Sequence, residues 1–270
     1  MSSSQVEKHY DERTLERIGE KREESRIIGL RRYQNDLKLK LISYASLRVF
    51  MQDRSVLDLA CGRGGDLGKW KKKVKKYIGI DISSLSIDEA RKRNMERKYF
   101  KEDPEVFDLR VCDVCRPAVG MGGGSVGIVS CMFAIQYMLR SKESINDFLR
   151  NIFEVYKPQV FIAIFPSKEK ILKFKNKNKF CKISNIDLEE KSYSFSLDNC
   201  VENCKEWFVE EDIFDKAFKD NGYIDYSNVI SKPLTYKYLS KDEKHIADLY
   251  RFVVFAKKIT IKIKKPIENI

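Results

Sequence analysis

The segment VLDLACGRGGDLGKW, from Val56 to Trp70, decides the fold class of this chain. It starts as a short apolar strand, expected over residues 55–60, and passes through a glycine-rich turn into a helix that we expect to begin near Asp66. Such a turn lets a ligand approach the backbone closely and points the N–H groups of the helix N-terminus toward it. The segment therefore predicts the first strand-turn-helix unit of a ligand-binding α/β fold.

The rest of the chain continues this alternation of strands and helices. Strands are expected over residues 77–80, 106–111, 125–132 and 160–165, and helices over residues 87–97 and along the apolar stripe of residues 145–153. The alternation indicates a mainly parallel sheet with right-handed crossovers and flanking helices. A helix over residues 211–220 and strands over residues 223–230 and 250–256 complete a seven-stranded, Rossmann-like sheet.

Two segments lie outside this frame. Before the first strand, apolar residues spaced three or four apart predict an amphipathic helix; they are Ile27, Leu30, Tyr33, Leu37, Leu41 and Tyr44. After the fifth strand, residues 168–208 are rich in lysine and then alternate, which predicts an antiparallel β insertion. We therefore expect a single domain with an N-terminal helical arm (1–50), a Rossmann-like cofactor-binding core (51–167), the β insertion (168–210), a C-terminal helix with the last two strands (211–258) and a tail (259–270).

Charge and cysteine content narrow the class of protein. Lys and Arg total 52 against 40 Asp and Glu, and this net charge of +12 favours a polyanionic partner such as nucleic acid. The longest apolar run, residues 160–165, is too short to cross a bilayer, and the polar N-terminus has no apolar signal core, so no membrane partner is expected. Seven scattered cysteines fit reduced thiols in a cytosolic or nuclear protein. The lysines of residues 69–76 are expected to form the solvated face of a helix.

Acids that end three successive strands indicate the ligand. The turn does not match the dinucleotide pattern G-x-G-x-x-G, because its third glycine is misplaced. Asp58, inside the end of the first strand, suits the ammonium group of S-adenosylmethionine, and Asp81 can accept both ribose hydroxyls. Asp113 can accept the adenine amino group. Together the three carboxylates predict an S-adenosylmethionine site.

Several segments, in order along the chain, also carry a family resemblance. Residues 56–70 are similar to the sequence VLDLGCGKGGDLLKW, and matches to the same family's motifs occur at residues 6–10, 22–31, 31–38, 133–137, 203–209 and 249–255. The family that these segments resemble is the messenger RNA cap guanine-N7 methyltransferases. The resemblance implies a class I methyltransferase that uses S-adenosylmethionine, releases S-adenosylhomocysteine and methylates N7 of the guanine in the 5′ cap of RNA.

The resemblance further implies two sets of site residues. Those implied around the cofactor are Lys38, Asp58, Ala60, Gly62, Asp81, Asp113, Met132 and Tyr137. Those implied around the cap are Gln34, Arg63, Arg93, Phe133, Gln136, Tyr137, Pro166, Glu206 and Tyr250, with the two arginines near the triphosphate. Three residues depart from the family's pattern. Ala60 stands in place of a glycine, Gln34 in place of an asparagine and Gln136 in place of a histidine.

The implied chemistry needs no general base. Guanine N7 carries a free lone pair and its methylation releases no proton, so the protein has to align the reacting atoms and exclude water. We expect Glu206, Tyr137 and Tyr250 to orient the guanine, with the Glu206 carboxylate accepting from N1–H and from the 2-amino group. No metal is expected, because Cys112 and Cys115 lack two further ligands at a fitting spacing.

Two other functions stay open on the sequence alone. The chain would methylate another RNA, such as transfer RNA, if the matches at Glu206 and Tyr250 were accidental, or it would be a non-catalytic subunit of a capping enzyme. Capped RNA is the expected partner, a monomer is the expected state, and RNA guanylyltransferase, RNA triphosphatase and the RNA polymerase II tail are candidate protein partners. The expected location is the nucleus, or the cytoplasm for a viral protein.

Overall fold

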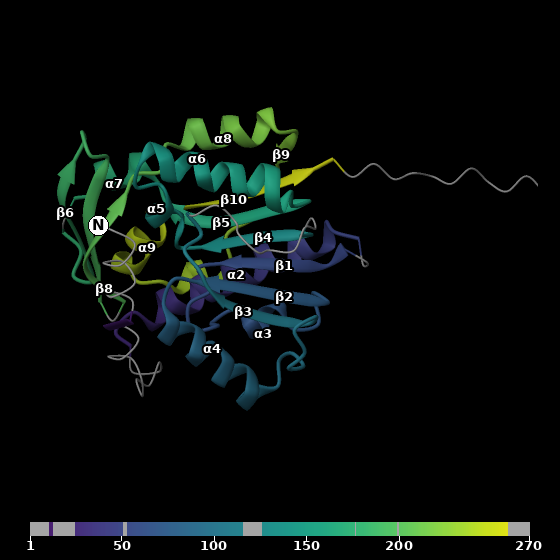
Figure 1. The fold of residues 1–270 in the computed structure, drawn as a ribbon. Helices are drawn as coiled ribbons and strands as arrows, with labels where there is room; N and C mark the ends of the chain where they lie inside the picture. The colour runs from purple at the N-terminus through teal and green to yellow at the C-terminus, as the bar shows by residue number, and fades with distance from the viewer. Residues whose placement is uncertain are drawn as a thin grey trace, which may run out of the picture.

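The main sheet has seven strands in the order β3-β2-β1-β4-β5-β10-β9 (Figure 1). The computed structural model describes residues 11–12, 25–50, 53–115, 126–175, 177–198 and 200–258. The strands are β1 (Ser55–Leu59), β2 (Lys76–Asp81), β3 (Phe107–Val111), β4 (Ile128–Met132), β5 (Val160–Pro166), β9 (Tyr223–Asp225) and β10 (Tyr250–Lys257). The first five are parallel, and β10 runs antiparallel to both β5 and β9. The mainly parallel, Rossmann-like sheet expected from the sequence is confirmed.

Helices cover both faces of this sheet (Figure 1). On one face lie α2 (Ile28–Leu47), α3 (Leu67–Trp70) and α4 (Ser84–Arg97), whose apolar residues share one core cluster. On the other face lie α5 (Ile135–Met138), α6 (Lys142–Arg150), the π-helical segment η3 (Asn151–Tyr156) and α8 (Glu211–Asp220), which share a second cluster. The remaining helices are α7 (Lys168–Lys173), η4 (Ser227–Val229), η5 (Leu234–Tyr238) and α9 (Lys241–Ala247).

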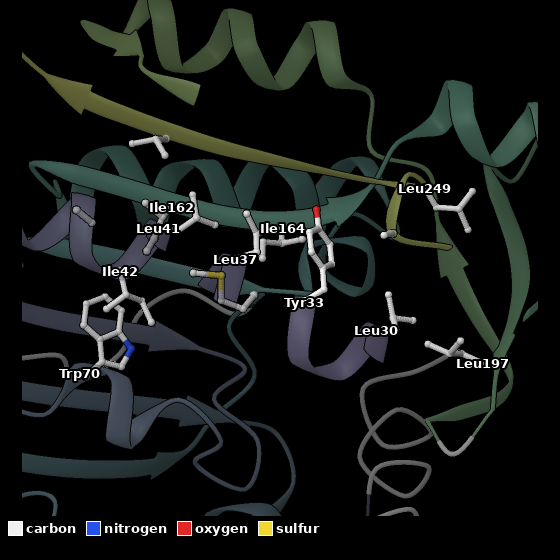
Figure 2. Packing of buried hydrophobic residues seen from close by; sticks show 14 of the residues in the cluster. Leu30, Tyr33, Leu37, Leu41, Ile42, Trp70, Ile162, Ile164, Leu197 and Leu249 are labelled. Carbon is white, nitrogen blue, oxygen red and sulfur yellow. The ribbon is translucent and has the colours of Figure 1, made fainter. Parts of the chain in front are cut away.

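The strand period of two divides the apolar residues between these clusters. On β5, Ile162 and Ile164 belong to the cluster beneath α2, whereas Phe161 and Phe165 belong to the cluster beneath α8. Figure 2 shows the side chains of α2 packed beside Ile162 and Ile164. The predicted stripe on α2 is buried at Leu30, Tyr33, Leu37 and Leu41, which anchors this helix to the sheet.

The expected β insertion forms a separate antiparallel sheet. Its strands are β6 (Cys181–Asp187), β7 (Ser192–Leu197) and β8 (Val201–Trp207), in that order. The small sheet stands beyond the carboxyl ends of the parallel strands (Figure 1), and a single bridge between Ser167 and Val209 joins the two segments that flank the insertion. The insertion therefore lies where ligands bind in open α/β sheets.

Two predicted elements are wrong. The helix expected to carry the lysine run of residues 69–76 ends at Trp70, which is fully buried. Lys72 adopts a left-handed φ of 65°, which is incompatible with a right-handed helix. The strand expected over residues 223–230 ends at Asp225, because the Asp225 carboxylate accepts from the backbone N–H of Ser227 at 2.7 Å and starts a turn. The motif at residues 6–10, the expected glycine turn at residues 120–124 and the tail at residues 259–270 lie outside the described residues.

One carboxylate joins two helices that are distant in the sequence. Glu243 on α9 accepts from the backbone N–H of Leu30 at 2.8 Å, at the N-terminus of α2, and from the backbone N–H of Ser240 at 3.0 Å, at its own N-terminus. The N-cap residue of α2, Ile27, offers no side-chain cap of its own. Glu243 therefore caps both helices and fixes the start of the helix that carries Gln34 and Lys38.

We expect Glu243→Ala to lower the free energy of unfolding by about 2–3 kcal/mol, because two N-terminal N–H groups lose their acceptor. Urea unfolding followed by circular dichroism measures this loss. Asp242→Ala is the matched control, since Asp242 makes only a 3.8 Å ion pair with Lys179 in a half-exposed setting, and it should cost less than about 1 kcal/mol. Equal midpoints for the two variants would show that Glu243 does not cap α2.

Candidate active site

Two adjoining cavities open at the carboxyl ends of β1, β2 and β4. The first, about 160 Å³, is lined among others by Ala60, Gly62, Asp81, Asp113, Met132, Phe133 and Tyr137. The second, about 190 Å³, is lined among others by Lys38, Asp58, Ala60, Arg63, Arg93 and Met132. Ala60 and Met132 belong to both, so the cavities meet between β1 and β4, where the strand order reverses. The structure thus brings together all eight residues that the sequence placed around the cofactor.

Left-handed backbone occurs at both strand ends that flank this junction. Ala60, after β1, has a φ of 53°, and Phe133, after β4, has a φ of 63°. A positive φ is costly for residues with a Cβ atom, and such residues concentrate at functional sites. Gly64, with a φ of 65°, cannot be replaced in this way by a residue with a side chain, because a Cβ atom there would lie 2.6 Å from Leu67 Cδ1. Ala60 therefore adopts a backbone conformation that favours glycine, the residue that the resemblance implies at this position.

Asp81 lies at the wall of the first cavity with 8% of its surface exposed. Its carboxylate accepts from the backbone N–H groups of Gly62 at 2.7 Å and Ser83 at 3.0 Å, which fixes its orientation at the end of β2. Burial raises the pKa of this carboxyl, although the backbone donors oppose the shift. Ser83 also donates to Asp11, at 2.5 Å, which brings a residue of the N-terminal arm beside Asp81. Each Asp81 oxygen retains lone-pair capacity for a further donor such as a hydroxyl.

Asp58 lines the second cavity and is almost completely buried. It accepts from the hydroxyl of Tyr77 at 2.8 Å. Burial and the nearby Asp66 raise the pKa of Asp58 to about 7, while the Tyr77 hydrogen bond opposes the shift. A carboxyl with this pKa gains from a bound cation, because the cation offsets the cost of holding the charge in a buried position. The ammonium group predicted for this end of the site meets that requirement.

Asp66 is a member of the site that the sequence analysis did not assign. Its two carboxylate oxygens each lie 2.8 Å from an ammonium group, one from Lys38 and one from Lys69. Burial would raise the pKa of Asp66, but the two lysines outweigh it and lower the pKa to about 2. Lys38, predicted beside the cofactor, is therefore held in the second cavity by an ion pair across the glycine turn.

Asp113 has a cationic partner that the sequence analysis also missed. The Arg140 guanidinium donates to Asp113 Oδ2 at 3.0 Å, and the backbone N–H of Cys115 donates to Oδ1 at 2.9 Å. Arg140 itself lines the first cavity. These contacts fix the Asp113 carboxylate in the wall of the first cavity, where the adenine was predicted.

The predicted cap residue Glu206 is the centre of a buried polar cluster. With 2% of its surface exposed, it accepts from the Tyr137 hydroxyl at 2.6 Å on Oε1 and from the Tyr193 hydroxyl at 2.6 Å on Oε2. Gln136 Nε2 adds a longer contact to Oε1, at 3.5 Å. Burial raises the pKa of Glu206, and only these neutral donors oppose the shift. Tyr193, which the sequence analysis did not assign to the site, lies directly opposite Glu206 in the β7–β8 ladder.

Aromatic residues connect this cluster to the cofactor cavities. Tyr137 both donates to Glu206 and lines the first cavity. The rings of Phe133 and Tyr250 meet edge to face, with centroids 5.0 Å apart, and the Lys38 ammonium lies 5.4 Å from the Phe133 centroid. Burial raises the pKa of Tyr250, and the negative charge of Glu206 adds to this shift.

The other predicted cap residues lie around these groups. Pro166 pairs with Tyr250 in the β5–β10 ladder, so the two strands converge at the aromatic pair. Gln34 is half-buried on α2, one helical turn before Lys38 and on the same face. Arg63 and Arg93 line the second cavity, from the glycine turn and from α4. Of the predicted cap residues, Arg63 and Arg93 line the second cavity and Phe133 and Tyr137 the first. The residues that line neither are Gln34, Gln136, Pro166, Glu206 and Tyr250.

The raised pKa of Asp58 predicts pH-dependent ligand binding. Below pH 7 the carboxyl is mostly neutral and cannot pair with an ammonium group, so affinity for S-adenosylhomocysteine should rise as pH increases through 7. Between pH 8 and pH 6 we expect about a tenfold loss, measured by titration calorimetry. Asp58→Asn retains an acceptor for Tyr77 but cannot ionise, and it should bind weakly with a flat pH profile. A pH-independent wild-type affinity would remove Asp58 from the ammonium site.

The fold and the site together define a Rossmann-like methyltransferase with a site suited to S-adenosylmethionine. The cavities lie where the strand order reverses, beside the glycine turn. Acids at the ends of β1 and β2, and a third just after β3, offer acceptors for an ammonium group, a ribose and an adenine. A family model of the mRNA (guanine-N(7))-methyltransferase domain matches residues 1–223. The chain belongs to this family.

Relatives with assigned names agree with this membership. The chain is 33% identical to an mRNA cap guanine-N(7) methyltransferase of Caenorhabditis elegans, over 77% of this chain and 61% of the relative. It is 30% identical to mRNA cap guanine-N(7) methyltransferase 1 of Oryza sativa subsp. japonica, over 93% of this chain and 73% of the relative. The chain spans about three fifths of the length of the first curated relatives that it matches.

Solved structures support the fold. Magnesium protoporphyrin IX methyltransferase from Synechocystis PCC 6803, solved with bound SAM, superposes with a TM-score of 0.58 at 12% identity, over 95% of this chain and 97% of that one. An S-adenosylmethionine-dependent methyltransferase from Clostridium acetobutylicum gives 0.56 at 13% identity, over 84% and 92%. Among the described residues, no helix combines the length and apolar character needed to cross a membrane.

Proposed function

We propose that this chain transfers the methyl group of S-adenosylmethionine to N7 of the guanine in the 5′ cap of RNA. The observation that carries the proposal is the Glu206 cluster, a buried carboxylate held by two tyrosine hydroxyls at the edge of an acid-lined cavity. The names of the relatives point to the same reaction. When bound, S-adenosylmethionine supplies an electrophilic methyl group on a sulfonium.

Glu206 complements guanine both before and during the reaction. Its carboxylate can accept from guanine N1–H and the 2-amino group, which turns the opposite edge of the base, with N7, toward the cavity. Methylation at N7 makes the ring cationic, and the contacts around Glu206 come from neutral donors. A buried, uncompensated carboxylate therefore stabilises the charge that develops in the transition state more than the neutral ground state.

Positioning carries the rest of the proposed mechanism. Tyr137 touches both Glu206 and the first cavity, so it sets the distance between the base and the methyl donor. Phe133 and Tyr250 supply aromatic surface that excludes water at the junction. Holding the reacting atoms in line can account for roughly 7–11 kcal/mol of the barrier. No side chain has to remove a proton.

The cap triphosphate would meet the guanidinium groups of Arg63 and Arg93. Both line the second cavity, one on the glycine turn and one on α4. Planar guanidinium groups suit phosphate oxygens because they donate two parallel hydrogen bonds. We further propose that the chain acts as a monomer, in the nucleus or in a virus-infected cytoplasm, with other capping enzymes or the RNA polymerase II tail as partners.

A single assay tests the proposal against its alternatives. The protein is incubated with tritiated S-adenosylmethionine and, in parallel, with GpppA-capped RNA, GpppG-capped RNA, the same RNA without a cap, and transfer RNA. Label on N7 of the cap guanine only is the expected result. Labelling of transfer RNA alone would favour the second RNA-methylating function, and absence of any labelling beside intact S-adenosylhomocysteine binding would indicate a non-catalytic subunit.

A further inference from the structure

One buried acceptor beside Glu206 has no hydrogen-bond donor. Gln136 is 3% exposed, and its carbonyl oxygen Oε1 is without a partner among the described residues. Its Nε2 donates to the backbone carbonyl of Phe133 at 3.0 Å and approaches Glu206 Oε1 at 3.5 Å. An unpaired buried acceptor is destabilising, so such a group calls for a ligand that donates to it.

The orientation of the amide is fixed by its neighbours. Turning it over would set the carbonyl oxygen against the Phe133 carbonyl and the Glu206 carboxylate, which are both acceptors. The nitrogen therefore faces these groups, and Oε1 is the atom left for a ligand. α5 carries Gln136 and Tyr137 side by side, so the Gln136 amide nitrogen and the Tyr137 hydroxyl approach the same Glu206 oxygen from one helix.

The acceptors around Glu206 can be counted against the donors of a base. Tyr137 donates to one carboxylate oxygen and Tyr193 to the other, and the Gln136 nitrogen approaches Oε1 only at 3.5 Å, the long limit of a hydrogen bond. Each oxygen can therefore accept one more strong hydrogen bond. Gln136 Oε1 is the third free acceptor. The Watson–Crick edge of guanine presents three N–H bonds, one at N1 and two on the 2-amino group.

We propose that Gln136 Oε1 accepts the second hydrogen of the 2-amino group and so makes the site selective for guanine over hypoxanthine. The inference rests on the proposed cap-binding role of Glu206 and adds a specificity-determining residue to it. Hypoxanthine has N1–H but no amino group, so it leaves Gln136 Oε1 and one Glu206 lone pair buried without a donor. Sites built to hydrogen-bond a polar group reject analogues that lack it far more strongly than apolar pockets do.

The test compares kcat/KM on GpppA-capped and inosine-capped (IpppA) RNA within each variant. The ratio of the two rates cancels any loss of folded protein. Wild type should prefer GpppA by about 100-fold or more, and Gln136→Met, which is similar in shape but has no acceptor, should reduce the preference about tenfold by slowing the guanine cap. Gln159→Met, before β5 at the opposite end of the sheet, is the matched control and should keep both rates.

The outcomes separate the inference from the proposed function. Failure of the wild-type protein to methylate GpppA-capped RNA would overturn both together. Normal methylation with the same guanine preference in wild type and Gln136→Met would overturn only the role of Gln136. Binding of S-adenosylhomocysteine to Gln136→Met, measured by calorimetry, should match wild type, because Gln136 lines neither cofactor cavity. A reduced guanine preference beside unchanged cofactor binding supports the inference.

Discussion

Glu206→Gln should lower kcat/KM on capped RNA by about 100-fold or more. The substitution keeps the size of the side chain but replaces one acceptor oxygen with an NH₂ group, which then faces the N–H donors of guanine. A mismatched buried donor costs about 1–3 kcal/mol, and the lost charge adds to this, because Glu206 is the carboxylate proposed to stabilise the cationic product ring. A radiolabel assay with GpppA-capped RNA measures the loss.

Two further variants identify the cause of that loss. Glu206→Asp keeps the charge but withdraws it by one methylene, so activity should fall here as well. Tyr193→Phe removes one donor to Oε2 without changing the carboxylate, and it should cost less, about tenfold. S-adenosylhomocysteine affinity should stay within about twofold of wild type in all three. Near-normal kcat/KM for Glu206→Gln would contradict the guanine assignment and favour another RNA substrate.

The sequence was informative where local pattern and topology agree. Asp58, Asp81 and Asp113 lie at or just beyond the ends of parallel strands, and a parallel sheet collects such positions at one edge. The predicted helix over residues 211–220 matches α8 at both ends. Its C-terminal end was predictable because Gly222, with a φ of 79°, provides a left-handed position just beyond it. These features depend on few residues that are close in sequence.

The missed elements depend on tertiary contacts. Trp70 ends α3 by inserting into the core, and no pattern in the lysine run that follows it records that contact. Tyr193 meets Glu206 only through the register of β7 and β8, which shifts between Phe195 and Leu197. The alternation along β7 places Tyr193 on one face but does not say which residue lies opposite. Asp66 and Arg140 were missed for the same reason, since Lys38 lies 28 residues from Asp66 and Asp113 lies 27 residues from Arg140 in the chain.

Asp81→Asn should weaken S-adenosylmethionine binding by about 2–3 kcal/mol, roughly 30- to 150-fold in Kd. The carboxylate is proposed to accept both ribose hydroxyls, and it already accepts from the backbone N–H groups of Gly62 and Ser83. The asparagine amide offers one acceptor where the aspartate offers two, so either the turn or the ribose loses a partner. Burial raises the pKa of the Asp81 carboxyl, so an alkaline buffer favours its ionised form, and titration calorimetry at pH 8 measures the affinity.

The loss of binding must be separated from damage to the glycine turn. Asp81→Ala removes the acceptor for Gly62 and Ser83 as well, so it should lower the midpoint of urea unfolding in addition to the affinity. Asp81→Asn should lose affinity with a smaller drop in that midpoint than Asp81→Ala, because its remaining oxygen can still accept from one of the two backbone N–H groups. If the asparagine variant bound S-adenosylmethionine as tightly as wild type while remaining folded, the Asp81 carboxylate would serve only to hold the turn between β1 and α3, and the ribose contacts would have to come from another wall of the cavity.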